Sequence, residues 1–68
     1  MKIERLIRMA NDISDYFSAE PDRNVAIEGV RNHIAKAWEP RMRKAILDYL
    51  KADGSGLSDL AKAALEKL

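Results

Sequence analysis

Residues 36–43 of this chain read Lys-Ala-Trp-Glu-Pro-Arg-Met-Arg, and the proline within this stretch decides the fold. A proline disfavours helical geometry at the residue before it, so Pro40 ends one helix near Trp38. Proline is also favoured at the first position of a helix, so the same residue opens the next helix. The stretch therefore predicts a sharp corner between two consecutive helices.

Two further breaks lie on either side of this corner. Pro21 ends the first helix, and either Pro21 or Asn24 opens the second. The run Asp-Gly-Ser-Gly at 53–56 ends the third helix, with Gly54 in the left-handed conformation that often follows a helix. Ser58 is a natural N-cap for a short last helix. The breaks predict four helices, at about residues 2–19, 22–38, 40–53 and 58–67.

Apolar residues recur along each predicted helix at the i, i+3, i+4 and i+7 spacing of an amphipathic helix, and no segment alternates apolar and polar residues like a strand. Short connections predict antiparallel or steeply angled neighbours. We therefore expect an all-α fold, a small bundle of three longer helices plus a short C-terminal helix, in a single domain over residues 1–68. The expected apolar stripes are Ile3, Leu6, Ile7, Ala10, Ile13 and Phe17; Ile27, Val30, Ile34, Ala37 and Trp38; Met42, Ile46, Leu47, Tyr49 and Leu50; and Leu60, Ala61, Ala64, Leu65 and Leu68.

The composition is that of a small globular domain that needs help to be stable. Charged residues make up 34% and hydrophobic residues 47% of the 68 positions, which argues against disorder. A single core of this size rarely supplies more than about 3–5 kcal/mol. The chain has no cysteine and one histidine, so disulfides are excluded and a stapling metal is not expected. The remaining sources of stability are efficient helix packing, formation of a homo-oligomer by the isolated chain, or binding to a partner protein.

The charge and the N-terminal sequence argue against membranes and secretion. Charged residues lie within the first turns and no uninterrupted apolar run follows, so we expect no signal peptide, no membrane-spanning segment and a cytoplasmic location. The net charge of +1 favours neither nucleic acid nor an anionic membrane surface as a partner.

No group of residues predicts catalysis or metal binding. His33 is the only histidine, and its neighbours one turn away, Gly29, Val30 and Ala37, supply neither a second ligand nor an acid–base companion. Gly-Ser-Gly at 54–56 follows a helix rather than a strand, and no Lys-Ser/Thr pair follows it, so it is not a phosphate loop. We expect no catalytic, cofactor-binding or metal-binding residue, and a structural or interface role for His33.

The basic cluster at 41–44 allows a second interpretation. A helix–turn–helix would place Arg41, Arg43 and Lys44 at the start of a DNA-reading helix. Glu39 and Asp48 flank the cluster, and the overall charge is nearly neutral, which argues against nucleic acid. Arginine is also enriched at protein interfaces, where its fork binds carboxylates.

The first helix carries its charges in an order that opposes the helix dipole. Cations crowd its N-terminal half and carboxylates its C-terminal half, whereas the dipole favours the reverse. We interpret this helix as held in place by packing or by a partner. The residues concerned are Lys2, Arg5 and Arg8, and Asp12, Asp15 and Glu20.

Two stretches carry a resemblance to a known family. Residues 33–43 join a His-hydrophobe pair to Trp38-Glu39-Pro40-Arg41-Met42-Arg43, and residues 6–13 read Leu-Ile-Arg-Met-Ala-Asn-Asp-Ile. Both resemble the motifs of the delta subunits of soluble, NAD-dependent formate dehydrogenase. The chain departs from that pattern at Glu39, usually Asp, at Ala37, usually a bulky aromatic residue, and at Asp59, often Pro.

The resemblance implies an accessory subunit of a cytosolic complex that oxidises formate to carbon dioxide and reduces NAD. Its implied partner is the large catalytic subunit, whose assembly or stability it supports. The molybdenum or tungsten cofactor, the iron–sulfur clusters and the flavin belong to other subunits, and this chain binds none. An independent small helical binding module, either a DNA binder or a self-associating protein, stays as the alternative. The expected partner-binding residues are Arg8, Asn11, His33, Trp38, Pro40, Arg41 and Arg43.

Two of these expectations leave alternatives open. The Trp38 ring either fills the core or anchors a partner. Arg41 and Arg43 are two residues apart on a helix and point in different directions, so at most one faces a partner squarely. The other is available to pin the corner to a carbonyl or carboxylate.

Overall fold

The computed structural model describes residues 2–68, which form four α-helices and contain no strand, so the all-α prediction is confirmed. The helices are α1 (Ile3–Phe17), α2 (Arg23–Ala37), α3 (Pro40–Ala52) and α4 (Asp59–Leu65). Each begins and ends within about two residues of the boundary that the prolines, glycines and capping residues indicate, which is the usual uncertainty of helix ends.

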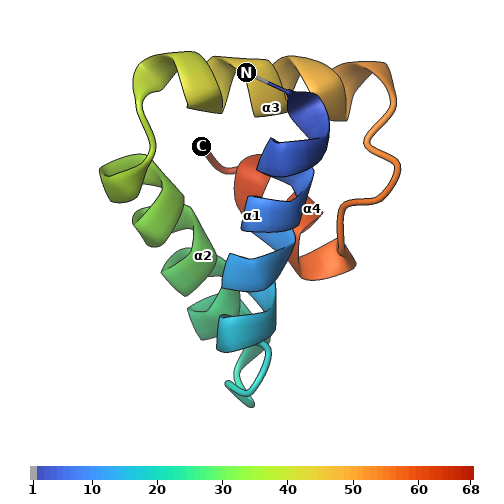
Figure 1. The fold of residues 1–68 in the computed structure, drawn as a ribbon. Helices are drawn as coiled ribbons and strands as arrows, with labels where there is room; N and C mark the ends of the chain where they lie inside the picture. Colours follow the sequence, from blue (N-terminus) through green and yellow to red (C-terminus); the bar gives the residue numbers. More distant parts are fainter. Residues whose placement is uncertain (1) are drawn as a thin grey trace.

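The first two helices form a V that the third helix closes (Figure 1). α1 and α2 run in opposite directions and diverge from the loop that joins them. α3 lies across the open end of the V, and α4 packs against both α1 and α2. The chain therefore surrounds a core that every helix contributes to, with α3 contributing least: Ile46 is its one fully buried residue.

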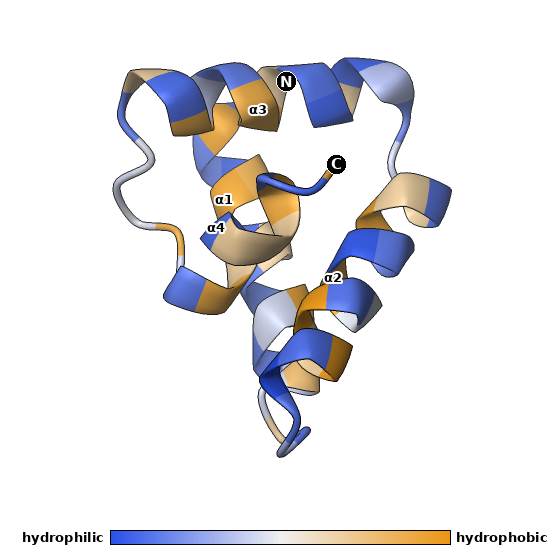
Figure 2. Cartoon of the chain, turned by 180° about the vertical axis from the view of Figure 1, so that it is seen from behind, coloured by the Kyte–Doolittle hydropathy of each residue, from blue (hydrophilic) through white to orange (hydrophobic). Residues whose placement is uncertain are grey.

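The seven-residue helix α4 lies at the centre of this core. Two of its buried residues, Ala61 and Ala64, are fully covered, and their small side chains allow the backbone of α4 to approach α2 closely. Hydrophobic and hydrophilic residues alternate around α2 in Figure 2, and the buried ones are Ala26, Ile27, Val30 and Ile34. The buried apolar residues are Leu6, Ala10, Ala26, Ile27, Val30, Ile34, Trp38, Ile46, Leu57, Leu60, Ala61, Ala64 and Leu65. Among the expected stripe residues, Ala37 and Leu68 are exposed, and the others that are absent from this list are partly buried and pack against the core.

A buried side chain and internal hydrogen bonds hold the corner between α2 and α3. The Trp38 side chain is only 4% exposed and belongs to the core, which decides between the two alternatives for this ring. Arg43 reaches back from α3 and donates hydrogen bonds to the backbone oxygens of Trp38 and Ala35, the latter at 3.2 Å. Glu39 caps α3 without a side-chain hydrogen bond, so Pro40 and Arg43 hold this corner instead.

The start of α2 differs from the expectation. Asp22, and neither Pro21 nor Asn24, is the N-cap, because its carboxylate accepts hydrogen bonds from the backbone N–H groups of Asn24 (2.9 Å) and Val25 (3.4 Å). A carboxylate at this position satisfies donors that the helix leaves unpaired and complements the helix dipole. Pro21 lies one residue earlier, so it ends the preceding turn and does not open α2.

The break between α3 and α4 agrees with the expectation. Gly54 has φ +74°, and its backbone N–H donates to the oxygen of Tyr49 at 3.0 Å, which ends α3. Ser58 caps α4 and accepts from the backbone N–H of Ala61 at 3.1 Å. Both predictions are confirmed.

Among residues 2–68, no helix has the length and apolar character needed to cross a membrane.

Candidate functional site

Three of the expected partner-binding residues make contacts within the chain itself. Trp38 lies in the core and Arg43 is bonded to backbone oxygens of the corner, as described above. Asn11 holds the loop before α4 to α1: its amide nitrogen donates to the oxygen of Gly56 at 2.8 Å, and its amide oxygen accepts from the N–H of Ser58 at 2.9 Å. One turn later, the Oγ atoms of Ser14 and Ser58 lie 2.7 Å apart. These contacts give Asn11, Trp38 and Arg43 structural roles, which sequence spacing alone did not reveal for Asn11.

The other four expected residues lie at the surface. Arg8, His33, Pro40 and Arg41 are exposed, on α1, α2 and the first turn of α3. They are not gathered at one point. His33 lies beside the C-terminal half of α1, whereas Pro40 and Arg41 lie at the corner.

The basic cluster at 41–44 does not form a single basic face. Arg43 points back to the corner, and Lys44 pairs with Asp48 at 2.9 Å in an exposed i, i+4 ion pair. Arg41 alone of the three projects without a hydrogen bond or ion pair to residues 2–68. The arrangement does not support the DNA-reading helix considered above, which requires several cations on one side.

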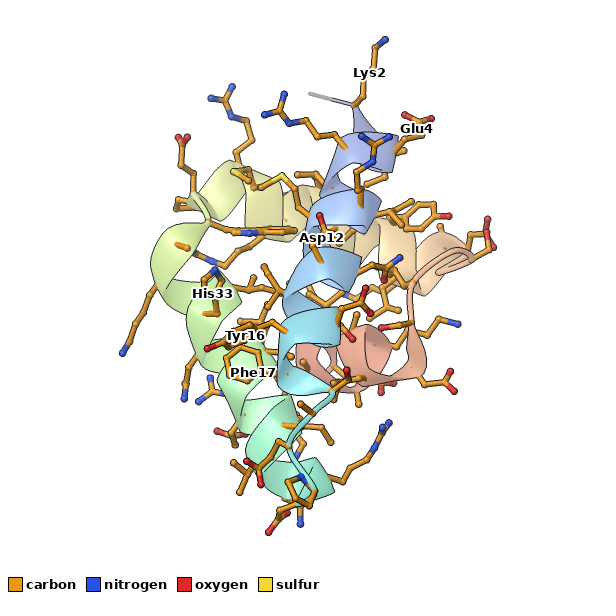
Figure 3. The ribbon with its side chains drawn as sticks, turned by 60° about the horizontal axis from the view of Figure 1, so that its bottom comes forward. Lys2, Glu4, Asp12, Tyr16, Phe17 and His33 are labelled. Carbon is orange, nitrogen blue, oxygen red and sulfur yellow. The ribbon has the colours of Figure 1, made fainter. Side chains whose placement is uncertain are left out.

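An apolar hollow lies between the C-terminal half of α1 and the middle of α2. It is lined by Asp12, Ile13, Tyr16, Phe17 and His33. Figure 3 shows Tyr16, Phe17 and His33 together between the two helices, with Asp12 further along α1. Tyr16 is 78% exposed, the largest exposure of any large hydrophobic side chain that the structure describes. Its ring meets the Phe17 ring edge-on, with 5.1 Å between centroids.

Two neighbouring hollows lie along the same pair of helices. The second hollow, nearer α3, is lined by Arg5, Leu6, Met9 and Met42, and Met9 lies one turn before Ile13 on the same side of α1. A third hollow shares Phe17 and His33 with the first and extends along α2 to Lys36, toward the α2–α3 corner. We call these three hollows together the α1 groove. Its residues are Arg5, Met9, Asp12, Ile13, Tyr16, Phe17, Gly29, His33, Lys36 and Met42.

The sequence showed only part of the α1 groove. His33, for which a structural or interface role was expected, lines it. Tyr16 was not predicted, although one signal existed: this aromatic residue follows Ile13 by three positions and so lies at the edge of the apolar stripe, next to the polar side of the helix. Ile13 and Phe17 belong to the predicted stripe, and Met9 lies beside it. All three side chains are partly buried and pack against the core.

Gly29 shapes the lower end of the α1 groove. A Cβ atom on Gly29 would lie 2.5 Å from two ring atoms of Phe17. The glycine therefore lets the Phe17 ring lie directly against the α2 backbone. This close approach explains a glycine in the middle of a helix, where glycine otherwise costs about 0.5–1 kcal/mol relative to alanine.

We expect Gly29→Ala to show this contact through a double-mutant cycle. In a Phe17→Ala background, Gly29→Ala stabilises the chain by about 0.5–1 kcal/mol, because only the helix preference changes. In the native background this gain is lost, because the new methyl group displaces the ring. Urea unfolding of the four variants measures the difference. An equal gain in both backgrounds would show that the ring does not lie on Gly29.

The chemistry of the surface is that of protein contact. No group of three or more metal-ligating side chains occurs within the described residues, and none of their buried side-chain polar atoms lacks a hydrogen-bond partner. A second, smaller apolar area lies between α3 and the C-terminus, where Leu47, Leu50, Leu65 and Leu68 meet. An exposed aromatic residue over an apolar groove, with arginines at its edge, is typical of protein–protein interfaces.

Comparison with known proteins identifies a relative for nearly the whole chain. A family model described as the NADH-dependent formate dehydrogenase delta subunit FdsD matches residues 5–65. The matched region contains all four helix cores, the α2–α3 corner and the α1 groove. Neither the curated proteins nor the solved structures contain a match.

Proposed function

This chain belongs to the NADH-dependent formate dehydrogenase delta subunit family, and we propose that it is a non-catalytic accessory subunit of that complex. In this proposal it binds the large catalytic subunit through protein–protein contacts and supports the assembly or stability of that subunit. It acts in the cytoplasm, as part of an enzyme that converts formate and NAD to carbon dioxide and NADH.

The α1 groove is the observation that carries the binding role. Tyr16, at 78% exposure, adds little to the chain's own stability, and Ile13 and Phe17 pack against the core while part of their apolar surface stays uncovered. Burying such apolar surface against a partner contributes roughly 25 cal/mol per Å². A chain this small, with a single core and no cysteine, gains much of its stability from such a partner.

The chain's own residues support the non-catalytic part of the proposal. Ser14 and Ser58 bond to each other in a structural contact, and His33 has no hydrogen-bonded companion among the described residues. Iron–sulfur clusters are held by cysteine thiolates, and this sequence contains none. We therefore assign the molybdenum or tungsten cofactor, the clusters and the flavin to other subunits of the complex.

The experiment that tests the proposed function is affinity purification of the tagged chain from its native host. We expect the large catalytic subunit of formate dehydrogenase to be recovered with it and to be identified by mass spectrometry. Deleting the chain is expected to reduce the amount of assembled, soluble catalytic subunit. Recovery of only the chain itself, or of DNA-bound proteins, would contradict the proposal.

The two arginines that flank Met42 are expected to behave differently. Arg41→Ala leaves the unfolding transition unchanged but weakens assembly, because this exposed side chain has no contact inside the chain. Arg43→Ala lowers the stability of the isolated chain by about 1–3 kcal/mol, since two corner carbonyls lose a charged donor. Thermal unfolding and co-purification of each single variant separate the two effects. If Arg43→Ala melts like the native chain, the corner does not depend on this side chain.

A further inference from the structure

We propose that the α1 groove binds an acidic amphipathic helix of the large subunit, with carboxylates over the arginine end of the groove and an apolar side chain beside Tyr16. This inference rests on the proposed function, because it names the part of the partner that the accessory subunit recognises. Its basis is the length, the charge and the lining of the groove.

The length of the groove suits a helical segment. It follows α1 from Arg5 to Phe17, twelve residues along one helix, which corresponds to about 18 Å. A partner helix of about three turns covers this distance. Apolar residues recur along it at i, i+4 and i+8, at Met9, Ile13 and Phe17, so they present a continuous line to an adjacent helix.

The charges of the groove select an acidic partner. Arg5 and Arg8 lie exposed at the end near α3, and Lys36 lines the α2 side toward the same end. Asp12 is the one carboxylate that lines the three hollows, and Glu4 lies beside Arg5 and Arg8 in a neighbouring hollow. Neither Arg5 nor Arg8 takes part in an ion pair among residues 2–68. These cations lie in the N-terminal half of α1, where they oppose the helix dipole. Carboxylates of a partner compensate that unfavourable placement.

The apolar lining suits side chains rather than a small polar ligand. Met9 and Met42 line the arginine end, and methionine adapts its shape to different partner side chains. Tyr16 and Phe17 supply rigid aromatic surface at the other end, and such residues commonly dominate binding energy at protein interfaces. The groove thus combines an adaptable basic end with a fixed aromatic end.

The first test is charge reversal at the arginine end. The double variant Arg5→Glu with Arg8→Glu is expected to fold, because acidic residues near the start of α1 agree with the helix dipole. Its affinity for the formate dehydrogenase complex purified from a host that lacks this chain should fall about tenfold or more, with a weaker salt dependence. The matched control, Arg23→Glu with Lys67→Glu, changes the net charge equally at exposed positions outside the α1 groove. It should bind within about twofold of the native chain.

The second test identifies the occupant. A photo-crosslinking benzoylphenylalanine in place of Tyr16, in the intact complex, is expected to label one peptide of the large subunit rich in Asp and Glu. The same group in place of Val25, which is 53% exposed but lies outside the groove, should not label that peptide. A basic peptide, a second copy of this chain, or native affinity of the Arg5/Arg8 variant would overturn the inference. Failure of the native chain to bind the complex at all would instead overturn the proposed function.

Discussion

Trp38→Ala is expected to unfold the isolated chain at room temperature or leave it marginally stable. The ring is 4% exposed and forms part of the core beside the α2–α3 corner. Removing a buried tryptophan costs about 3–5 kcal/mol, because apolar contacts are lost and a cavity is left. A core of this size supplies about the same amount in total. One substitution therefore removes most of the free energy that stabilises the folded chain.

Circular dichroism during heating, with the native chain in parallel, measures this effect. Trp38→Phe is the matched control, since a smaller aromatic ring keeps part of the contacts and should lower the transition by a smaller amount. Adding the catalytic subunit should recover part of the lost stability of Trp38→Ala, because a partner that binds only the folded chain stabilises it. A melting temperature equal to that of the native chain would place the ring outside the core.

Asn11→Ala is expected to destabilise the chain by about 1–3 kcal/mol, a large effect for a half-exposed side chain. Its amide forms two hydrogen bonds with the backbone of the loop before α4, to Gly56 and Ser58. Losing them leaves the Ser58 N–H without its partner and releases the loop that positions the central helix. The destabilisation therefore extends to the core, because α4 contributes four buried residues to it: Leu60, Ala61, Ala64 and Leu65.

Asn32→Ala provides the control for this prediction. Asn32 is exposed in the middle of α2, and its side chain makes no hydrogen bond with residues 2–68, so its replacement should change the free energy of unfolding by less than about 0.5 kcal/mol. Urea unfolding of both variants gives the comparison. Hydrogen exchange adds a local readout, because the amides of residues 56–61 should lose protection in Asn11→Ala. Equal stability of the two variants would show that the loop is held by other contacts.

The motif residues that carried the family resemblance divide into two groups in the structure. Asn11, Trp38 and Arg43 have their polar or aromatic groups turned into the fold, where they hold the loop, fill the core and close the corner. Arg8 and Arg41 have theirs turned outward. A short motif therefore specifies a shape and a surface at once. Only the outward residues are open to contact with a partner subunit.

The sequence by itself determined the helices and their order. Proline, glycine and serine act through their own backbone or over one helical turn, so Pro40, Gly54 and Ser58 mark their boundaries without knowledge of the rest of the chain. The apolar stripes depend only on the helical period, so most core residues could also be predicted. The residue that opens α2 was assigned wrongly because Pro21, Asp22 and Asn24 all suit a helix start, and only the hydrogen bonds of Asp22 distinguish them.

The tertiary structure alone decided which surface is left for a partner. The bonds of Asn11 join residues 45 and 47 positions apart in the chain, and no local pattern predicts such a separation. The α1 groove exists because α1 and α2 diverge while α4, and not a longer helix, fills the space between them. Exposure of Tyr16 and half-burial of Ile13 and Phe17 follow from that angle. The angle between packed helices is set by how their side chains interlock, a property of all four helices together.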